Sequence, residues 1–113
     1  MAKQVPDGFP FADRVAQVYD GDRFAGHLLV TVPELVRTRR NRGITYVDMD
    51  FARPDPEEPD GLRYEDRADP GTESARQELE AGELDWYGEK FTLRWLAPEP
   101  AARVRRELFG RSG

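Results

Sequence analysis

The chain has 113 residues and no cysteine, so it fits one ordinary domain and excludes disulfides, thiolate catalysis and zinc–thiolate or iron–sulfur sites. Its net charge of −5 hides an acidic middle, residues 52–89, between a balanced first half and a basic C-terminal end. Nonspecific nucleic-acid binding needs clustered positive charge, and the acidic middle argues against it. The first residues lack the apolar stretch of a signal peptide, and no apolar run could span a bilayer, which predicts a cytoplasmic protein with no membrane contact.

Residues 14–32 are predicted to form a β-hairpin. With Gly21-Asp22 as its two-residue loop, Val15 pairs with Leu28. The other register considered, with the loop one residue earlier, mixes apolar and polar side chains on both faces. The preferred register places six apolar residues on one face: Val15, Tyr19, Phe24, Leu28, Val30 and Val32.

A short helix and a strand are predicted next. Pro33 suits a first helical turn and Gly43 a stop, with arginines gathered between them. Residues 44–51 then alternate between apolar and polar side chains, which is typical of a strand with one buried face. Asp48 and Asp50 fall on the polar face of this strand.

Residues 52–71 are predicted as a Pro-rich acidic insertion within the single domain 1–113. From 53 to 71 the apolar side chains other than proline are Leu62, Tyr64 and Ala68. A loop this long is usually functional or disordered, and low hydrophobicity with high charge favours disorder. The insertion either folds back on the protein's own arginines or presents a surface to another molecule.

A helix and a second hairpin follow the insertion. Residues 72–81 predict a helix that packs weakly through Ala75 and Leu79. In the hairpin over 83–96, the loop is assigned to Gly88-Glu89. That loop pairs Trp86 with Phe91 and Leu84 with Leu93, and it keeps five large apolar side chains on one face: Leu84, Trp86, Phe91, Leu93 and Trp95.

The last element is a helix that begins at a proline and stops at Gly110, with Ala101, Val104 and Leu108 on one stripe. The element order is then ββαβ, acidic segment, αββα. It predicts an α+β fold: a single two-layer domain, with an antiparallel sheet of about five strands and helices on one face.

No catalytic constellation is visible. The only histidine, His27, lies mid-strand, and the sequence has no nucleophile elbow, phosphate-binding loop or dinucleotide fingerprint. We therefore expect no cofactor and no enzymatic activity. Asp48 and Asp50, at i and i+2 on one strand face, are candidate ligands for Mg²⁺ or Ca²⁺ in a metal-dependent enzyme, although the solvated face of a half-buried strand has the same pattern.

Two arginine pairs are candidate phosphate-binding residues. Arg37 and Arg40 share one side of the first predicted helix, and Arg103 and Arg106 share one side of the last. No aromatic residues interleave with them, and no helix-turn-helix or RNA-binding motif is present. Nucleic-acid or phosphate binding is therefore the first alternative function, and the metal-dependent enzyme is the second.

The sequence favours a small non-enzymatic interaction protein, such as a regulator, inhibitor, immunity-type partner or assembly accessory. Its expected partner is another protein with a basic surface, and self-association is left open. The acidic insertion would supply the contact. The candidate partner-binding residues are Glu57, Glu58, Asp60, Leu62, Tyr64, Glu65 and Asp66.

Overall fold

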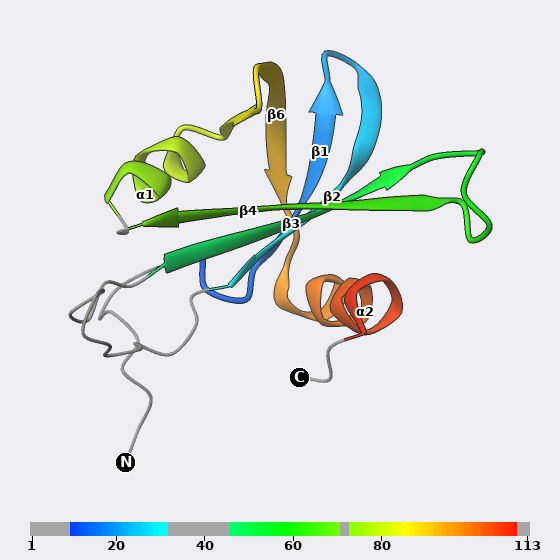
Figure 1. Ribbon diagram of the computed structural model, residues 1–113. Coiled ribbons are helices and arrows are strands. Elements are labelled where there is room, and N and C mark those ends of the chain that lie inside the picture. The colour runs from blue at the N-terminus through cyan, green and yellow to red at the C-terminus, as the bar shows by residue number, and fades with distance from the viewer. Residues whose placement is uncertain (1–9, 32–45, 71–72, 111–113) are drawn as a thin grey trace, which may run out of the picture.

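The computed structural model describes residues 10–31, 46–70 and 73–110, which form an α+β fold of one antiparallel sheet and two helices (Figure 1). The strands follow the order β4-β3-β2-β1-β6-β5 across the sheet. Six strands are described where about five were predicted, because the acidic segment supplies one. The elements are β1 (Val15–Asp20), β2 (Arg23–Thr31), β3 (Tyr46–Pro54), β4 (Leu62–Pro70), α1 (Glu73–Glu80), β5 (Glu83–Trp86), β6 (Glu89–Trp95) and α2 (Pro98–Phe109).

The unexpected strand, β4, lies in the segment 52–71. The chain completes β3, turns at residues 55–61 and returns as β4, paired with β3 over its whole length. The turn is closed by its own backbone, since the Asp55 N–H donates to the Gly61 carbonyl at 2.9 Å. The side of β4 that faces the core carries charged side chains instead of apolar ones. Hydrophobic periodicity therefore does not reveal this strand.

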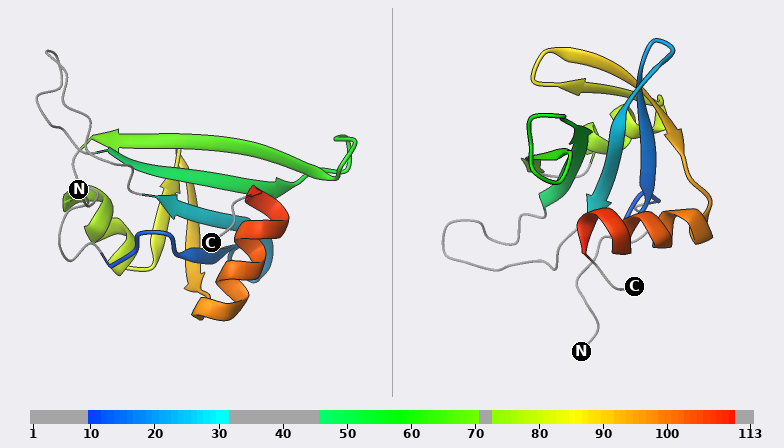
Figure 2. Two further views of the ribbon diagram at one scale, coloured as in Figure 1. Left: turned by 90° about the horizontal axis from the view of Figure 1, so that it is seen from below. Right: turned by 90° about the vertical axis from the view of Figure 1, so that its right-hand side faces the viewer.

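We call the β3–β4 hairpin the arm. It runs across the other strands, and its turn extends past α2 (Figures 1 and 2). The sheet curls, so that side chains of its two edge strands, β4 and β5, contact each other. The curl encloses the main core, which consists of Phe11, Ala16, Val18, Leu28, Val30, Val47, Met49, Phe51, Ala75, Leu79, Leu84, Trp86, Phe91 and Leu93.

The two helices pack on opposite faces of the sheet, so the prediction of helices on one face is wrong. Helix α1 contributes Ala75 and Leu79 to the main core. Helix α2 packs Ala101 against Val15 and Leu29 in a separate small cluster. Each of the two helices therefore covers part of one face of the sheet.

A β-bulge explains why both faces of the first hairpin are apolar. The Gly21-Asp22 loop is as predicted, but the register shifts after Val18, and Val15 pairs with Leu29 rather than Leu28. A slip of one residue moves side chains to the other face. Gly26 lies at the bulge with a φ of 141°, and a Cβ there would lie 2.2 Å from the Ala52 carbonyl oxygen, so only glycine fits.

The second hairpin differs from its predicted register by two residues. Its loop is Tyr87-Gly88, with φ values of 51° and 97°, so both central residues have the positive φ of a type I′ turn. Trp86 consequently pairs with Glu89 and not with Phe91. A two-residue shift preserves the faces: of the five predicted apolar side chains, Leu84, Trp86, Phe91 and Leu93 are buried, and Trp95 is partly buried against the core.

Other expectations are confirmed. The apolar residues of the third predicted strand, Val47, Met49 and Phe51, are buried, and Gly110 ends α2 in the left-handed conformation. The helix predicted between Pro33 and Gly43 lies outside the described residues. In the part of the chain that is described, no helix is long and apolar enough to cross a membrane.

Candidate functional site

Side chains of the arm join β5 and β6 where the curled sheet brings its edges together. The indole Nε1–H of Trp86 donates to Glu65 Oε1 at 2.8 Å. Arg53 Nη1 donates to the same Glu65 oxygen at 3.3 Å and to Glu89 Oε1 at 3.0 Å. We call these residues, together with Arg67, the seam. Polar side chains thus link two strand edges that share no backbone ladder.

Arg67 of β4 is the most connected residue of the seam. It donates to Glu78 Oε1 at 2.7 Å, to Asp69 Oδ2 at 2.9 Å and to the Asp85 carbonyl at 2.6 Å. Its guanidinium carbon lies 5.5 Å from the centroid of the Trp86 ring. Burial lowers the pKa of Arg67, but the hydrogen bond and charge of Glu78 and the charge of Asp69 outweigh it, and the pKa lies above its ordinary value. The side chain is only 15% exposed, so it acts inside the structure.

Glu65 is the acidic counterpart of Arg67. Burial raises the pKa of this carboxyl. The hydrogen bonds from Trp86 and Arg53, together with the charges of Arg53 and Arg63, lower it by more than burial raises it, so the net pKa lies below its ordinary value. Arg63 Nε lies 2.9 Å from Glu65 Oε2. Of the predicted partner-binding residues, Glu65 is therefore already engaged by the protein's own arginines.

The tip of the arm, residues 55–61, contrasts with its stem. Glu57, Glu58 and Asp60 are exposed, and among the residues described no basic side chain forms an ion pair with them. The tip backbone is nevertheless fixed: Asp60 Oδ1 accepts the Leu62 N–H at 3.1 Å, and the Gly61 N–H donates to the Glu58 carbonyl at 3.0 Å. Three carboxylates therefore project from an ordered turn.

Leu62, Tyr64 and Asp66 alternate along β4 on the face opposite the seam. The Tyr64 hydroxyl donates to the Leu108 carbonyl at 2.5 Å, and its ring lies edge-on to Phe109 with centroids 6.1 Å apart. Burial and then the charge of Asp60 raise the pKa of Tyr64 above its ordinary value. Tyr64 and Asp66, but not Leu62, line a hollow of about 520 Å³ between the arm and the end of α2, together with Asp50, Glu65, Leu108 and Phe109.

The candidate metal ligands lie on the same face of the arm. Asp50 is directly opposite Asp66, and Asp48 is directly opposite Ala68. Across the described ranges, no group of three or more acidic, histidine or cysteine side chains is arranged to hold a metal ion. Among the described residues, Asp48 and Asp50 therefore have no third side chain placed to complete a metal site with them.

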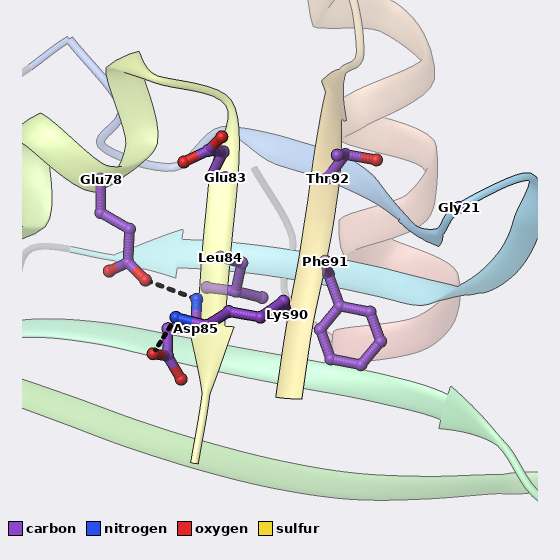
Figure 3. A pocket seen from close by; sticks show the side chains of 8 residues that line it. All are labelled: Gly21, Glu78, Glu83, Leu84, Asp85, Lys90, Phe91 and Thr92. Atoms are coloured by element: carbon purple, nitrogen blue, oxygen red, sulfur yellow. Dashed lines mark hydrogen bonds and ion pairs between the residues drawn. The ribbon is translucent and has the colours of Figure 1, made fainter. Parts of the chain in front are cut away.

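A second hollow, of about 480 Å³, lies against β5 and β6 (Figure 3). Three of the charged groups around it have partners, since Lys90 Nζ lies 2.8 Å from Asp85 Oδ2 and Glu78 Oε2 accepts the Asp85 N–H at 2.7 Å, and the fourth, Glu83, is exposed. His27 lies elsewhere, half-buried on β2, where burial lowers its pKa. This hollow contains no nucleophile and base in contact.

The structure describes one of the two predicted phosphate-binding arginine pairs. Arg103 and Arg106 are exposed on α2, whereas Arg37 and Arg40 lie outside the described residues. The arginines with structural roles, Arg53 and Arg67, were not singled out from the sequence. The available signal was their even spacing from Glu65 and Asp69, which places all four residues on one side of the arm.

Three comparisons were made, against family models, curated proteins and solved structures, and none of them matched this chain.

Proposed function

We propose that this chain is a small non-enzymatic interaction protein that binds a basic surface of another protein through the tip of the arm. The observation that supports this proposal is the difference between paired and unpaired carboxylates within one segment. In the stem, Glu65 and Asp69 meet Arg53, Arg63 and Arg67. In the tip, three carboxylates face solvent on an ordered turn.

The geometry of the tip suits recognition of a basic partner. Its backbone is held by its own hydrogen bonds, so binding orders little additional chain. It lies at the far end of the arm, beyond α2, where a partner can approach it (Figure 2). Exposed charges of one sign accelerate encounter with an oppositely charged surface, and salt screens this attraction.

The test is affinity capture with the full chain as bait. The tip variant carries Glu57→Lys and Glu58→Lys. A matched control carries Glu83→Lys and Glu107→Lys, which are exposed on other elements and make the same change in net charge. Circular dichroism establishes that both variants fold.

We expect the wild type and the control to recover the same bound protein and the tip variant to lose it. Recovery should fall steeply between about 50 mM and about 300 mM salt, as the Debye length shortens. Equal recovery by the tip variant would overturn the proposal.

A further inference from the structure

Near the tip, the two sides of the arm carry different side chains. The inner side carries Arg53, Arg63 and Glu65. The outer side carries Ala52 opposite Tyr64 and Pro54 opposite Leu62. Ala52 is buried, at 1% exposure, but Leu62 is partly exposed and Tyr64 is 47% exposed, so these two side chains are accessible to another contact. Helix α2 contacts Tyr64 at the edge of this side, through the Leu108 carbonyl and the Phe109 ring.

The apolar side of the arm continues onto the neighbouring strands. His27 of β2 is directly opposite Ala52, and its ring lies 5.2 Å from that of Phe24. Phe24 in turn lies edge-on to Tyr19 at 5.8 Å, and Arg94 is stacked 4.1 Å above Tyr19. We call this set the aromatic strip; it comprises Arg94, Tyr19, Phe24, His27, Leu62 and Tyr64, with the buried Ala52 between His27 and Tyr64 in the strand register.

Two large side chains of the strip are well exposed: Phe24 at 45% and Tyr64 at 47%. Aromatic residues and arginine are enriched at the centres of protein interfaces, with polar groups at the rim. Scattered exposed apolar residues need no explanation, but a contiguous set that spans several strands indicates a contact surface.

The charges around the Tyr64 end of the strip are negative. Asp66 follows Tyr64 on the same side of β4, and the acidic tip begins just before Leu62. Asp60 is close enough to raise the pKa of the Tyr64 hydroxyl. The C-terminal end of α2, whose Leu108 carbonyl accepts from Tyr64, adds the negative end of a helix dipole. An apolar strip with this border is complementary to a segment that is apolar on one side and cationic on the other.

We propose that the aromatic strip docks an amphipathic, positively charged segment of the partner protein. Apolar side chains of that segment pack on Phe24 and Tyr64, and its lysines and arginines reach Asp66 and the tip. This inference rests on the proposed function and adds the partner's chemistry and a second contact surface. The charges increase the rate of encounter and orient the segment, and burial of the aromatic strip contributes to the binding free energy.

The test uses a synthetic peptide with leucines on one helical face and lysines on the other, titrated into the isotopically labelled full chain. A scrambled peptide of the same composition has no apolar face. We expect amide shifts to move in the strip and the tip, and Tyr64→Ser and Phe24→Ser each to weaken the Kd about tenfold. Tyr87→Ser is the matched control, because Tyr87 is 71% exposed but lies in the β5–β6 turn, outside the strip.

Other occupants give different results, and each would overturn the inference. Equal affinity for the scrambled peptide means attraction by charge alone. Stronger binding of a single-stranded oligonucleotide at the same residues means a nucleic-acid surface. Dimerisation that Tyr64→Ser abolishes, with no peptide binding, means that a second copy covers the strip.

The two proposals fail separately. If the tip variant loses the captured protein while Tyr64→Ser retains it, the proposed function stands and the aromatic strip is not its contact. If Tyr64→Ser loses peptide binding while the tip variant still captures every protein, the aromatic strip stands as a peptide-binding surface and the acidic tip is not the recognition element.

Discussion

The stem of the arm, strands β3 and β4, and its tip, residues 55–61, both carry acidic side chains, but in opposite environments. In the stem, Glu65 and Arg67 bind partners on three elements other than β4, and the Arg67 guanidinium lies 5.5 Å from the centroid of the Trp86 ring. In the tip, Glu57 and Glu58 point into solvent. The difference teaches that acidity alone assigns no role. Strand alternation and the neighbouring strand decide whether a charge holds the fold together or remains available to a partner.

The sharpest way to break this comparison is to remove the central cation of the stem. Arg67→Met leaves Glu78, Asp69 and the Asp85 carbonyl without their donor in a partly buried setting. We expect the free energy of unfolding, measured by urea denaturation, to fall by about 2–4 kcal/mol.

The matched control for Arg67 is Arg76, which pairs with Glu73 and Glu80 on the surface of α1. Arg76→Met removes the same charge and keeps a similar apolar stem. Exposed pairs contribute little, so the urea midpoint should hardly change. Equal losses at the two positions would mean that the seam is no more important than a surface pair.

A smaller effect is expected from the Trp86–Glu65 hydrogen bond. Trp86→Phe removes the Nε1–H donor but retains a ring that can contact Phe51. We expect a loss of about 1–2 kcal/mol. A double-mutant cycle with Glu65→Gln isolates the bond, and a coupling energy near zero would show that the indole contributes through packing alone.

The acid dependence of stability tests the Glu65 carboxylate. Its pKa lies below the ordinary value of 4.5 in the folded state, although burial acts in the other direction, because Trp86, Arg53 and Arg63 stabilise the charged form. A carboxyl of this kind stabilises the fold above its unfolded pKa, and that contribution is lost as the pH falls through its folded pKa.

We therefore expect wild type to exceed Glu65→Gln by about 1 kcal/mol at neutral pH, with the difference shrinking below about pH 4. Denaturation at a series of pH values measures it. A difference that stays constant down to low pH would assign the effect to shape rather than charge.

The sequence predicts the apolar strands of the fold but not the strand β4, which carries Glu65 and Arg67 of the seam. The strand that carries Val47, Met49 and Phe51, and the burial of Leu84 and Trp86, follow from apolar alternation. β4 carries charges at the positions where another strand would carry valine or leucine, so no hydrophobic pattern indicates it. Its partners, Trp86 and Glu78, lie far along the chain and become neighbours only when the sheet curls.

The two hairpin errors have different physical origins. The bulge at Gly26 depends on close contact with the Ala52 carbonyl, which is a tertiary feature. In the β5–β6 hairpin, registers two residues apart bury the same side chains, so alternation cannot distinguish them. Turn geometry decides, and it places Tyr87 at a positive φ that few non-glycine residues adopt. For the candidate site, the sequence grouped Glu65 with Glu57, and the contacts of Glu65 with Trp86, Arg53 and Arg63 separate the two.

The smallest expected effect on stability comes from the tip, and the direction of the change distinguishes the tip from the stem. Glu57→Gln with Glu58→Gln removes two neighbouring exposed charges that repel each other and that, in the described structure, form no ion pair. We expect the free energy of unfolding to change by no more than about 0.5 kcal/mol, and to rise rather than fall. The Glu57 N–H still donates to Asp55 Oδ1, so the turn is retained. Urea denaturation at low salt measures the change, and a loss beyond about 1 kcal/mol would place these carboxylates with the stem. A stable protein that no longer captures its partner is the combination that only a recognition role predicts.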